Sequence, residues 1–273
     1  MEREIINLVK GYQTQDGAGV KLVRVLGNDT IDGYDPILML DSFDSTNPED
    51  YIAGFPMHPH RGIETISYVS SGKMMHRDNL GYSDTIEDGE VQWMTAGSGI
   101  LHEELIPPSK HMLGVQLWLN LPAKDKRAAP QYHSIKKNQI KDIPFDGGFI
   151  RLLAGKYKED TGFMSQYLPF DYYDIHLQEN STITIDVEEH RSIMLFTLVG
   201  EAIVGNTVIS EKTAAKLSKG NKVTIHSKQG AQVLFMSSTA LEEPVSWGGP
   251  IVMNTPEELQ KAFVELRNGT FIK

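Results

Sequence analysis

Residues 58–81 read HPHRGIETISYVSSGKMMHRDNLG, which brings a His-x-His pair, a strand-like run and a glycine turn into one short stretch. In a β-strand, residues i and i+2 project to the same face, so His58 and His60 would direct both imidazoles to one place. Pro59 between them has no N–H for a neighbouring strand, which suits a strand start or an edge such as a barrel rim. The stretch therefore predicts a β-fold with two histidines directed into one site.

A second motif lies further along the chain, where residues 89–104 read GEVQWMTAGSGILHEE. Strand alternation places His102 and Glu104 on one face and turns Glu103 away. If this piece and the His-x-His piece are neighbouring strands, three imidazoles and one carboxylate converge, a donor set that suits a divalent transition metal. Each motif alone is usually incidental. Their joint occurrence, with His102 42 residues after His60, favours a metal site and leaves the identity of the metal open.

Strand-like runs recur along most of the chain. Residues 114–120 (GVQLWLN) alternate with the strand period, so that Gln116 and Trp118 lie on the opposite face from the leucines. Many short strands separated by glycine-rich turns indicate an all-β barrel or sandwich. The runs stop between Ala123 and Pro144, where the sequence is polar and rich in lysine. We interpret this segment as the linker between two β domains, residues 1–134 and residues 145–273.

One helix is predicted near the C-terminus, over residues 256–267. Thr255 supplies an N-cap, Pro256 occupies the favoured first helical position, and Glu258 completes a capping box. The apolar side chains recur at helical spacing on one face: Leu259, Ala262, Phe263 and Leu266. We expect this face to pack on a barrel as a stability element, the alternative being an exposed docking face for a partner.

The composition excludes several classes of protein. The chain has 273 residues, of which 40% are hydrophobic, so it can bury a core. It has no cysteine, which rules out disulfides, thiolate metal ligands and a cysteine nucleophile. The net charge of −10 would repel phosphate backbones, so we expect no direct nucleic-acid binding. The start is charged and no apolar run approaches the ~20 residues of a membrane span, so we expect a cytoplasmic protein with neither a signal peptide nor a membrane anchor.

The ordered motifs resemble those of the cupin superfamily. Gly54, His58, His60, Glu64 and Gly72 approximate the first cupin motif, with shortened spacing after Gly54 and one extra residue before Gly72. The stretch from Gly89 approximates the second motif, although Thr95 replaces its proline, four residues instead of two precede His102, and His-x-Glu replaces the usual ending. These departures resemble the pirin family, bicupins related to quercetinases. The resemblance extends through GVQLWLNLP and PQY to EEPVSWGGPIVMNTPEEL, and so covers essentially the whole chain.

The resemblance implies a bicupin fold of two stacked β-barrels of the jelly-roll type, with a C-terminal α-helix. It also implies one metal, in the N-terminal barrel alone. The family ligands fall on His58, His60, His102 and Glu104, the same four residues that strand alternation selects. The histidines of the C-terminal half, His176, His190 and His226, are scattered without an H-x-H or H-x-E pattern, so we interpret them as ordinary surface or core residues.

The function that the resemblance implies is a quercetin 2,3-dioxygenase, which cleaves a flavonol with O2 and releases CO. The metal expected first is Fe(II), with Ni, Cu, Mn and Zn left open. Glu104, the one acidic ligand, is the candidate to accept the proton of the flavonol hydroxyl. The alternative is a regulatory protein of a different class, a transcription co-regulator or a modulator of a metabolic enzyme. Its metal would be structural or redox-sensing, and it would act through a protein partner.

Three further polar residues leave alternatives open. Glu64 stands at a position where many cupins have a ligand, but the pirin pattern takes its carboxylate from the second motif, so we expect Glu64 to support the site or the fold. His76 and Asp78 share one face of their segment. They either line the cavity or end a strand in a hydrogen-bonded turn.

Overall fold

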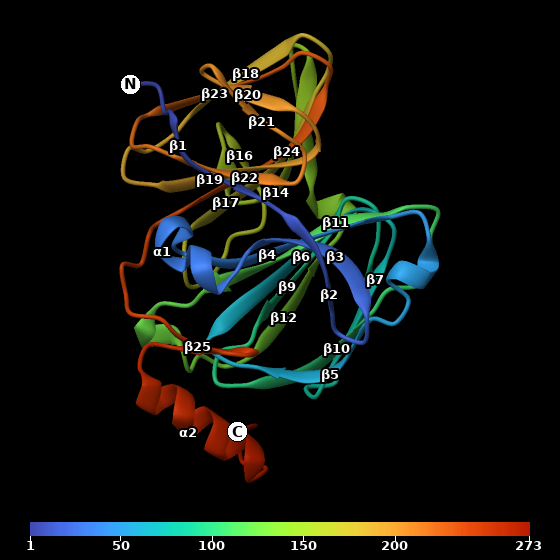
Figure 1. Cartoon of the computed structure of the whole chain (residues 1–273), viewed down its shortest axis with the longest axis vertical. Helices are drawn as coiled ribbons and strands as arrows, with labels where there is room; N and C mark the ends of the chain where they lie inside the picture. The colour runs from blue at the N-terminus through green and yellow to red at the C-terminus, as the bar shows by residue number, and fades with distance from the viewer. The chain divides into compact units, whose positions relative to one another are not determined.

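The computed structural model describes all 273 residues, which form two compact units whose regular secondary structure is mainly β-strand (Figure 1). The first unit contains residues 13–22, 37–135 and 241–273, and the second contains residues 1–12, 23–36 and 136–240. Only two α-helices occur, and neither is long and apolar enough to cross a lipid bilayer. The predicted all-β bicupin class is confirmed.

The first unit has a seven-stranded sheet in the order β12-β9-β6-β11-β4-β3-β2 and a four-stranded sheet in the order β5-β10-β7-β8. The chain passes between the units within β2 and β3. The strands are β2 (Tyr12–Asp16), β3 (Val20–Leu26), β4 (Ile37–Ser45), β5 (Phe55–His60), β6 (Ile63–Ser71), β7 (Met74–Asp78), β8 (Ser83–Ile86), β9 (Glu90–Thr95), β10 (Ile100–Leu105), β11 (Met112–Asn120), β12 (Gln131–Ile135), β25 (Ser246–Gly248) and β26 (Ile251–Met253).

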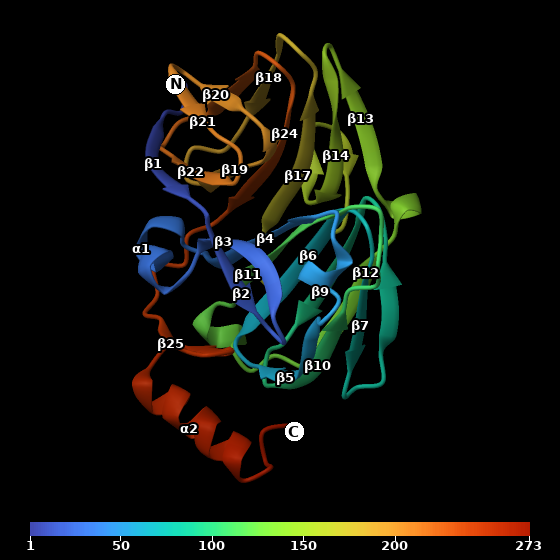
Figure 2. The ribbon, with the colours of Figure 1, turned by 45° about the vertical axis from the view of Figure 1, so that its right-hand side comes forward.

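Register within the small sheet decides which side chains meet. Along β10, buried and partly buried residues alternate, as expected for a strand with one face turned inward. His102 on β10 lies directly opposite His58 on β5 and opposite Asp78 on β7. Figure 2 shows β5 and β10 running side by side. At the turn before β10, Gly97 adopts a φ of +46°, and a Cβ there would lie 2.1 Å from the carbonyl oxygen of Ala128, so only glycine fits.

The second unit repeats the plan with a seven-stranded sheet, β1-β22-β19-β24-β17-β14-β13, and a four-stranded sheet, β18-β23-β20-β21. A short helix, α1 (Ile31–Tyr34), belongs to this unit. The strands are β1 (Ile5–Lys10), β13 (Lys141–Phe145), β14 (Gly148–Ala154), β15 (Lys156–Tyr157), β16 (Asp160–Thr161), β17 (Phe170–Leu177), β18 (Ser181–Asp186), β19 (Ser192–Gly200), β20 (Ala202–Val204), β21 (Thr207–Ile209), β22 (Thr213–Leu217), β23 (Lys222–Ser227) and β24 (Ala231–Ser238). Both sheets contribute to one apolar core, which contains Leu195, Ile225 and Phe235 among others.

The two ends of the chain lie in different units from those expected. Strand β1 pairs with β22 and so completes the sheet of the second unit, although residues 1–134 were expected to form the N-terminal barrel. Helix α2 (Pro256–Arg267) has the predicted bounds and the predicted capping box, but it lies in the first unit beside β25 and β26, whereas the C-terminal barrel of residues 145–273 was expected to include it. The physical reason is that each terminal segment pairs with, or is hydrogen-bonded to, residues far away in sequence.

Candidate metal centre

Three histidines of the first unit converge on one point. The ring centroids of His58 and His102, which face each other across β5 and β10, are 4.4 Å apart. His60 joins them with ring centroids 4.8 Å from His58 and 5.0 Å from His102. One nitrogen from each of the three imidazoles lies within 4.8 Å of the others, a spacing that could hold a metal ion. His60 and His102 are buried and His58 is partly buried, so the group is accessible on the His58 side.

Backbone carbonyls orient two of these imidazoles. The Nδ1 atom of His58 lies 2.8 Å from the carbonyl oxygen of Pro56, and the Nδ1 atom of His60 lies 3.1 Å from that of Pro250. A carbonyl oxygen only accepts, so each Nδ1 carries a proton, and a ring that carries no second proton presents a lone pair at Nε2. The two Nε2 atoms are 3.0 Å apart. Two lone pairs at this distance repel each other unless a cation lies between them, as metal coordination would provide.

The third histidine supplies an unsatisfied nitrogen. Nε2 of His102 is buried and has no hydrogen-bond partner. Burial and the neighbouring imidazoles lower the pKa of His60 to about 3, and the same causes lower the pKa of His102 well below its usual value. Both rings therefore stay neutral at pH 7, the form that binds a metal. The three nitrogen atoms fit a divalent transition metal.

Glu104 lies on the same face of β10 as His102, and Glu103 lies on the other face. The side chain of Glu103 is partly exposed, with an oxygen 3.5 Å from Arg77, whereas Glu104 is buried. The alternation predicted for the pair is therefore present. The Glu104 carboxylate accepts hydrogen bonds from the amide groups of Gln92 at 2.5 Å and Gln116 at 2.7 and 2.9 Å. The structure thus groups the three histidines directly. Glu104 lies two residues after His102 on the same inward face of β10, outside the group of three nitrogens and anchored by two amides.

Gln92 and Gln116 were not singled out in the sequence as site residues. Gln92 lies on β9 and Gln116 on β11, and both side chains are buried and face Glu104. A buried amide needs hydrogen-bond partners, and here the Glu104 carboxylate supplies the acceptor. A glutamine on the inner face of a buried strand was the signal in the sequence that could have identified these two site residues.

Glu64 has a different neighbour. Thr95 donates its hydroxyl to the Glu64 carboxylate at 2.6 Å, and burial raises the pKa of Glu64 to about 7. Glu64 and Ser67 are three residues apart on β6, so their side chains point to opposite faces of the strand. Ser67 is on the face that contacts Glu104, so Glu64 points away from the proposed ligands. This placement supports a role for Glu64 in the fold.

Of the two alternatives for His76 and Asp78, the structure shows the hydrogen-bonded turn at the end of the strand. Asp78 accepts backbone N–H groups from Leu80 at 2.9 Å and from Tyr82 at 3.1 Å, and so closes the turn after β7. His76 is fully buried, and its Nδ1 lies 3.4 Å from Nδ1 of His102. The pair therefore joins a turn to the third histidine of the metal centre.

The C-terminal segment contributes to the site from a distance in sequence. In addition to the Pro250 carbonyl that orients His60, Trp247 lies beside Trp118, whose ring in turn packs edge-on against His60. Next to His60, the buried Arg61 donates to Glu265 of α2 at 2.7 Å and to the carbonyl of Phe271 at 2.7 Å. The helix is therefore bonded to the residue that follows a proposed metal ligand.

The comparisons with known proteins identify the family of this chain. The sequence matches the family model described as Pirin over residues 19–119 and the model described as Pirin C-terminal cupin domain over residues 172–272. The chain belongs to the pirin family. The resemblance predicted from the motifs is confirmed.

Relatives of this pirin-family chain include proteins named as quercetinases. The provisionally named quercetin 2,3-dioxygenase PA3240 of Pseudomonas aeruginosa is 37% identical over 279 residues, which cover 98% of this chain and 97% of the relative. The crystal structure of quercetin 2,3-dioxygenase from Acinetobacter baumannii is 30% identical, with a TM-score of 0.91 and 99% of each chain covered. The bacterial pirin YhhW from Escherichia coli, solved in complex with nickel(II), shares the fold at a TM-score of 0.68 and 18% identity, over 86% of this chain and 98% of that one.

In the second unit, the histidines do not form a cluster. His176 stacks on Phe149 and pairs with Asp174 at 2.8 Å, and His226 bonds Thr182 at 3.0 Å. The interior of this pirin-family unit is filled by apolar side chains where the first unit has histidines, glutamines and Glu104. The group of three histidines in the first unit is the one cluster whose spacing suits a metal.

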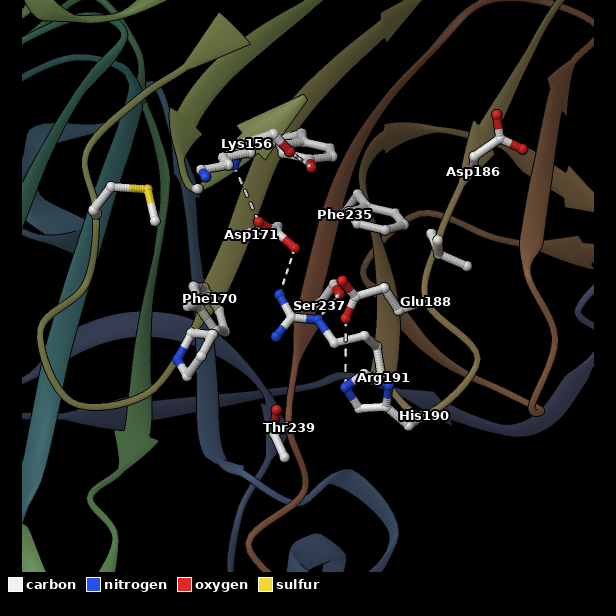
Figure 3. A pocket seen from close by; sticks show the side chains of 15 residues that line it. Lys156, Phe170, Asp171, Asp186, Glu188, His190, Arg191, Phe235, Ser237 and Thr239 are labelled. Carbon is white, nitrogen blue, oxygen red and sulfur yellow. Dashed lines mark hydrogen bonds and ion pairs between the residues drawn. The ribbon is translucent and has the colours of Figure 1, made fainter. Parts of the chain in front are cut away.

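The second unit also contains a cavity of about 470 Å³ (Figure 3). The stacked rings of Tyr173 and Phe235 lie along it, with centroids 5.0 Å apart. Arg191 donates to Asp171 at 2.6 Å and to Ser237 at 3.2 Å, so the guanidinium already has acceptors inside the cavity. His190, which lines the cavity, pairs with Glu188 at 3.4 Å. We assign this cavity no part in the metal centre.

Proposed function

We propose that this chain is a metal-dependent dioxygenase that cleaves a flavonol such as quercetin with O2 and releases CO. The observation that carries the proposal is the convergence of three imidazole nitrogens, of which two are 3.0 Å apart and the third is buried without a partner. The quercetinases among its relatives support the choice of flavonol and O2 as substrates. One O2 is consumed and one CO is released for each flavonol, which leaves an ester of two phenolic acids.

The proposed ligands are His58, His60, His102 and Glu104, with Fe(II) as the expected metal and Ni, Cu, Mn and Zn as alternatives. Three imidazoles and one carboxylate would leave open positions for a substrate oxygen and O2. The nickel(II) complex of the Escherichia coli pirin is consistent with a divalent metal in this fold. A bound divalent metal would act as a Lewis acid that favours the deprotonated 3-hydroxyl of the flavonol.

Glu104 is the proposed proton acceptor. A carboxylate within hydrogen-bond reach of the flavonol 3-hydroxyl can remove its proton as the oxygen approaches the site. The amide groups of Gln92 and Gln116 hold the Glu104 oxygens and so fix the direction in which the carboxylate can accept. The partly exposed His58 marks the side from which a planar substrate would enter. The apolar ring of Trp118 beside His60 offers an aromatic surface at the site.

The test is turnover of quercetin by protein loaded anaerobically with Fe(II). We expect O2 uptake and CO release in equal amounts, both of which should disappear in His102→Ala. Glu103→Gln is the matched control, since Glu103 lies on the other face of the same strand, and it should retain activity. If the wild-type protein binds the metal but releases no CO, the dioxygenase proposal fails. The regulatory alternative then becomes the better hypothesis, and a pull-down would search for its protein partner.

A further inference from the structure

His102 differs from the other two histidines in what holds its ring. The Nδ1 atoms of His58 and His60 face backbone carbonyls, which accept hydrogen bonds in every state of the protein. The Nδ1 atom of His102 faces a side chain, the Nδ1 atom of His76, at 3.4 Å. A ring nitrogen can either donate or accept, so the His102 tautomer depends on which tautomer His76 adopts.

Asp78 decides the tautomer of His76. Its Oδ2 lies 2.7 Å from Nε2 of His76, and both side chains are fully buried. An ionised carboxylate only accepts, so the proton of a neutral His76 must be on Nε2. That leaves Nδ1 of His76 as an acceptor, and the proton of His102 must then be on its own Nδ1. The Nε2 atom of His102 is left with a free lone pair, and it is the buried nitrogen that has no partner.

Asp78 and His76 are themselves held in place by neighbouring residues. The second oxygen of Asp78 accepts the N–H groups of Leu80 and Tyr82, so the carboxylate cannot rotate without breaking the turn. The ring of His76 is stacked on Tyr132 with centroids 4.1 Å apart and planes 15° from parallel. Asn79, within the turn, exchanges two hydrogen bonds with Leu101, the neighbour of His102. These contacts therefore fix the positions of the Asp78 and His76 side chains that determine the tautomer of His102.

We propose that Asp78 and His76 are positioning residues that hold His102 in the tautomer whose Nε2 can bind the metal. This inference rests on the proposed metal centre, but not on the identity of the substrate. A side-chain partner that orients a metal-binding histidine typically changes metal affinity by about 10- to 100-fold when it is removed.

The test replaces one carboxylate oxygen of Asp78 by an NH2 group. In Asp78→Asn, the amide oxygen can keep the turn and the NH2 group faces His76, so the NH2 group donates to Nε2 of His76. The proton of His76 moves to Nδ1, which then donates to His102, and the His102 proton moves to Nε2, where it blocks the metal. We expect metal affinity to fall by about 10- to 100-fold. His76→Phe keeps the stacked ring but leaves His102 free to adopt either tautomer, so its loss should be the smaller of the two.

Two measurements are needed. Nitrogen-15 spectra of the metal-free, histidine-labelled protein should show the proton on Nδ1 of His102 and on Nε2 of His76, and should show both positions reversed in Asp78→Asn. Nickel(II) affinity, measured by competition with a chelator, should then fall in the order wild type, His76→Phe, Asp78→Asn. The control is Asp44→Asn, which alters an Asp–His pair of the same 2.7 Å length, with His111 as the partner, and should bind nickel(II) like the wild type.

The outcomes separate this inference from the dioxygenase proposal. A proton on Nδ1 of His76 in the wild type, or Asp78→Asn binding nickel(II) as tightly as the wild type, overturns the inference whatever the flavonol assay gives. A larger loss in His76→Phe than in Asp78→Asn also overturns it, since that order would follow from packing. The reversed tautomers together with the expected order of affinities support it, even if the wild-type protein cleaves no flavonol. Thermal unfolding of each variant identifies any that does not fold.

Discussion

The Nε2 atoms of His58 and His60 lie 3.0 Å apart, while the Nδ1 atom of each ring faces a backbone carbonyl. The rings are thus held in an arrangement that a cation would stabilise. We expect one divalent metal ion per chain, bound by the first unit. Because the ion binds the folded state, it should raise the unfolding free energy, by about 2.7 kcal/mol at a free metal concentration 100 times the Kd.

Thermal unfolding at increasing metal concentration checks this prediction, with His60→Ala as the variant that should lose the shift in melting temperature. Elemental analysis of the purified protein gives the stoichiometry. Metal bound within residues 145–273, or a shift that persists in His60→Ala, would contradict the assignment of the site.

Glu103 and Glu104 are adjacent and chemically identical, but they lie on opposite faces of β10. Glu104→Gln removes the carboxylate to which Gln92 and Gln116 donate hydrogen bonds. We expect this variant to bind the metal more weakly and to lose turnover. Glu103→Gln alters a partly exposed contact with Arg77 and should be near neutral, within about 0.5 kcal/mol of wild-type stability. Metal affinity and CO release of the two variants are the measurements. Equal losses in both would mean that the face assigned to the ligand is incorrect.

The buried carboxyl of Glu64 predicts a pH dependence of stability. Burial raises its pKa from 4.5 to about 7, so the folded chain keeps a proton that the unfolded chain releases. Stability should therefore fall as the pH rises from the unfolded to the folded pKa, by about 3 kcal/mol from this group when the loss is complete. Glu64→Gln stays uncharged and should lack this dependence.

Urea unfolding of the wild type and of Glu64→Gln at about pH 5 and about pH 8 isolates this group, because the other titrating groups cancel in the comparison. The variant should gain stability relative to the wild type at the higher pH. A difference between the two proteins that does not change with pH would show that Glu64 is ionised in the folded state at both.

Helix α2 provides a comparison between two phenylalanines. Phe263 on the helix is only partly buried against the small cluster that contains Ile251 and Phe271, whereas Phe271 is 2% exposed. Phe271→Ala should cost about 3–5 kcal/mol of unfolding free energy. Phe263→Ala should cost less, about 1–2 kcal/mol, because less apolar area is lost from the interior. Denaturant unfolding measures both, and an unchanged stability in Phe263→Ala would favour the alternative that this face docks a partner.

Much of this molecule could be predicted from local pattern. The strand period placed His58 with His60 and His102 with Glu104, since successive side chains of a strand alternate between faces whatever the strand packs against. The start of helix α2 followed from Thr255, Pro256 and Glu258, because capping depends on residues within one turn. The absence of paired histidine motifs in the second half agreed with an apolar interior in the second unit.

The sequence could not decide which distant groups complete the site. The acceptor for His60 is the carbonyl of Pro250, 190 residues away, and the donors to Glu104 come from β9 and β11, neither of which pairs with β10. The contact of His76 with His102 depends on the register between β7 and β10, in which a slip of one residue would turn His76 to the other face. The unit that each end of the chain joins likewise depends on contacts with residues far away in sequence. The face of a strand on which a side chain lies follows from the local backbone period. The residue that this side chain contacts depends on strand register and packing, which only the tertiary structure decides.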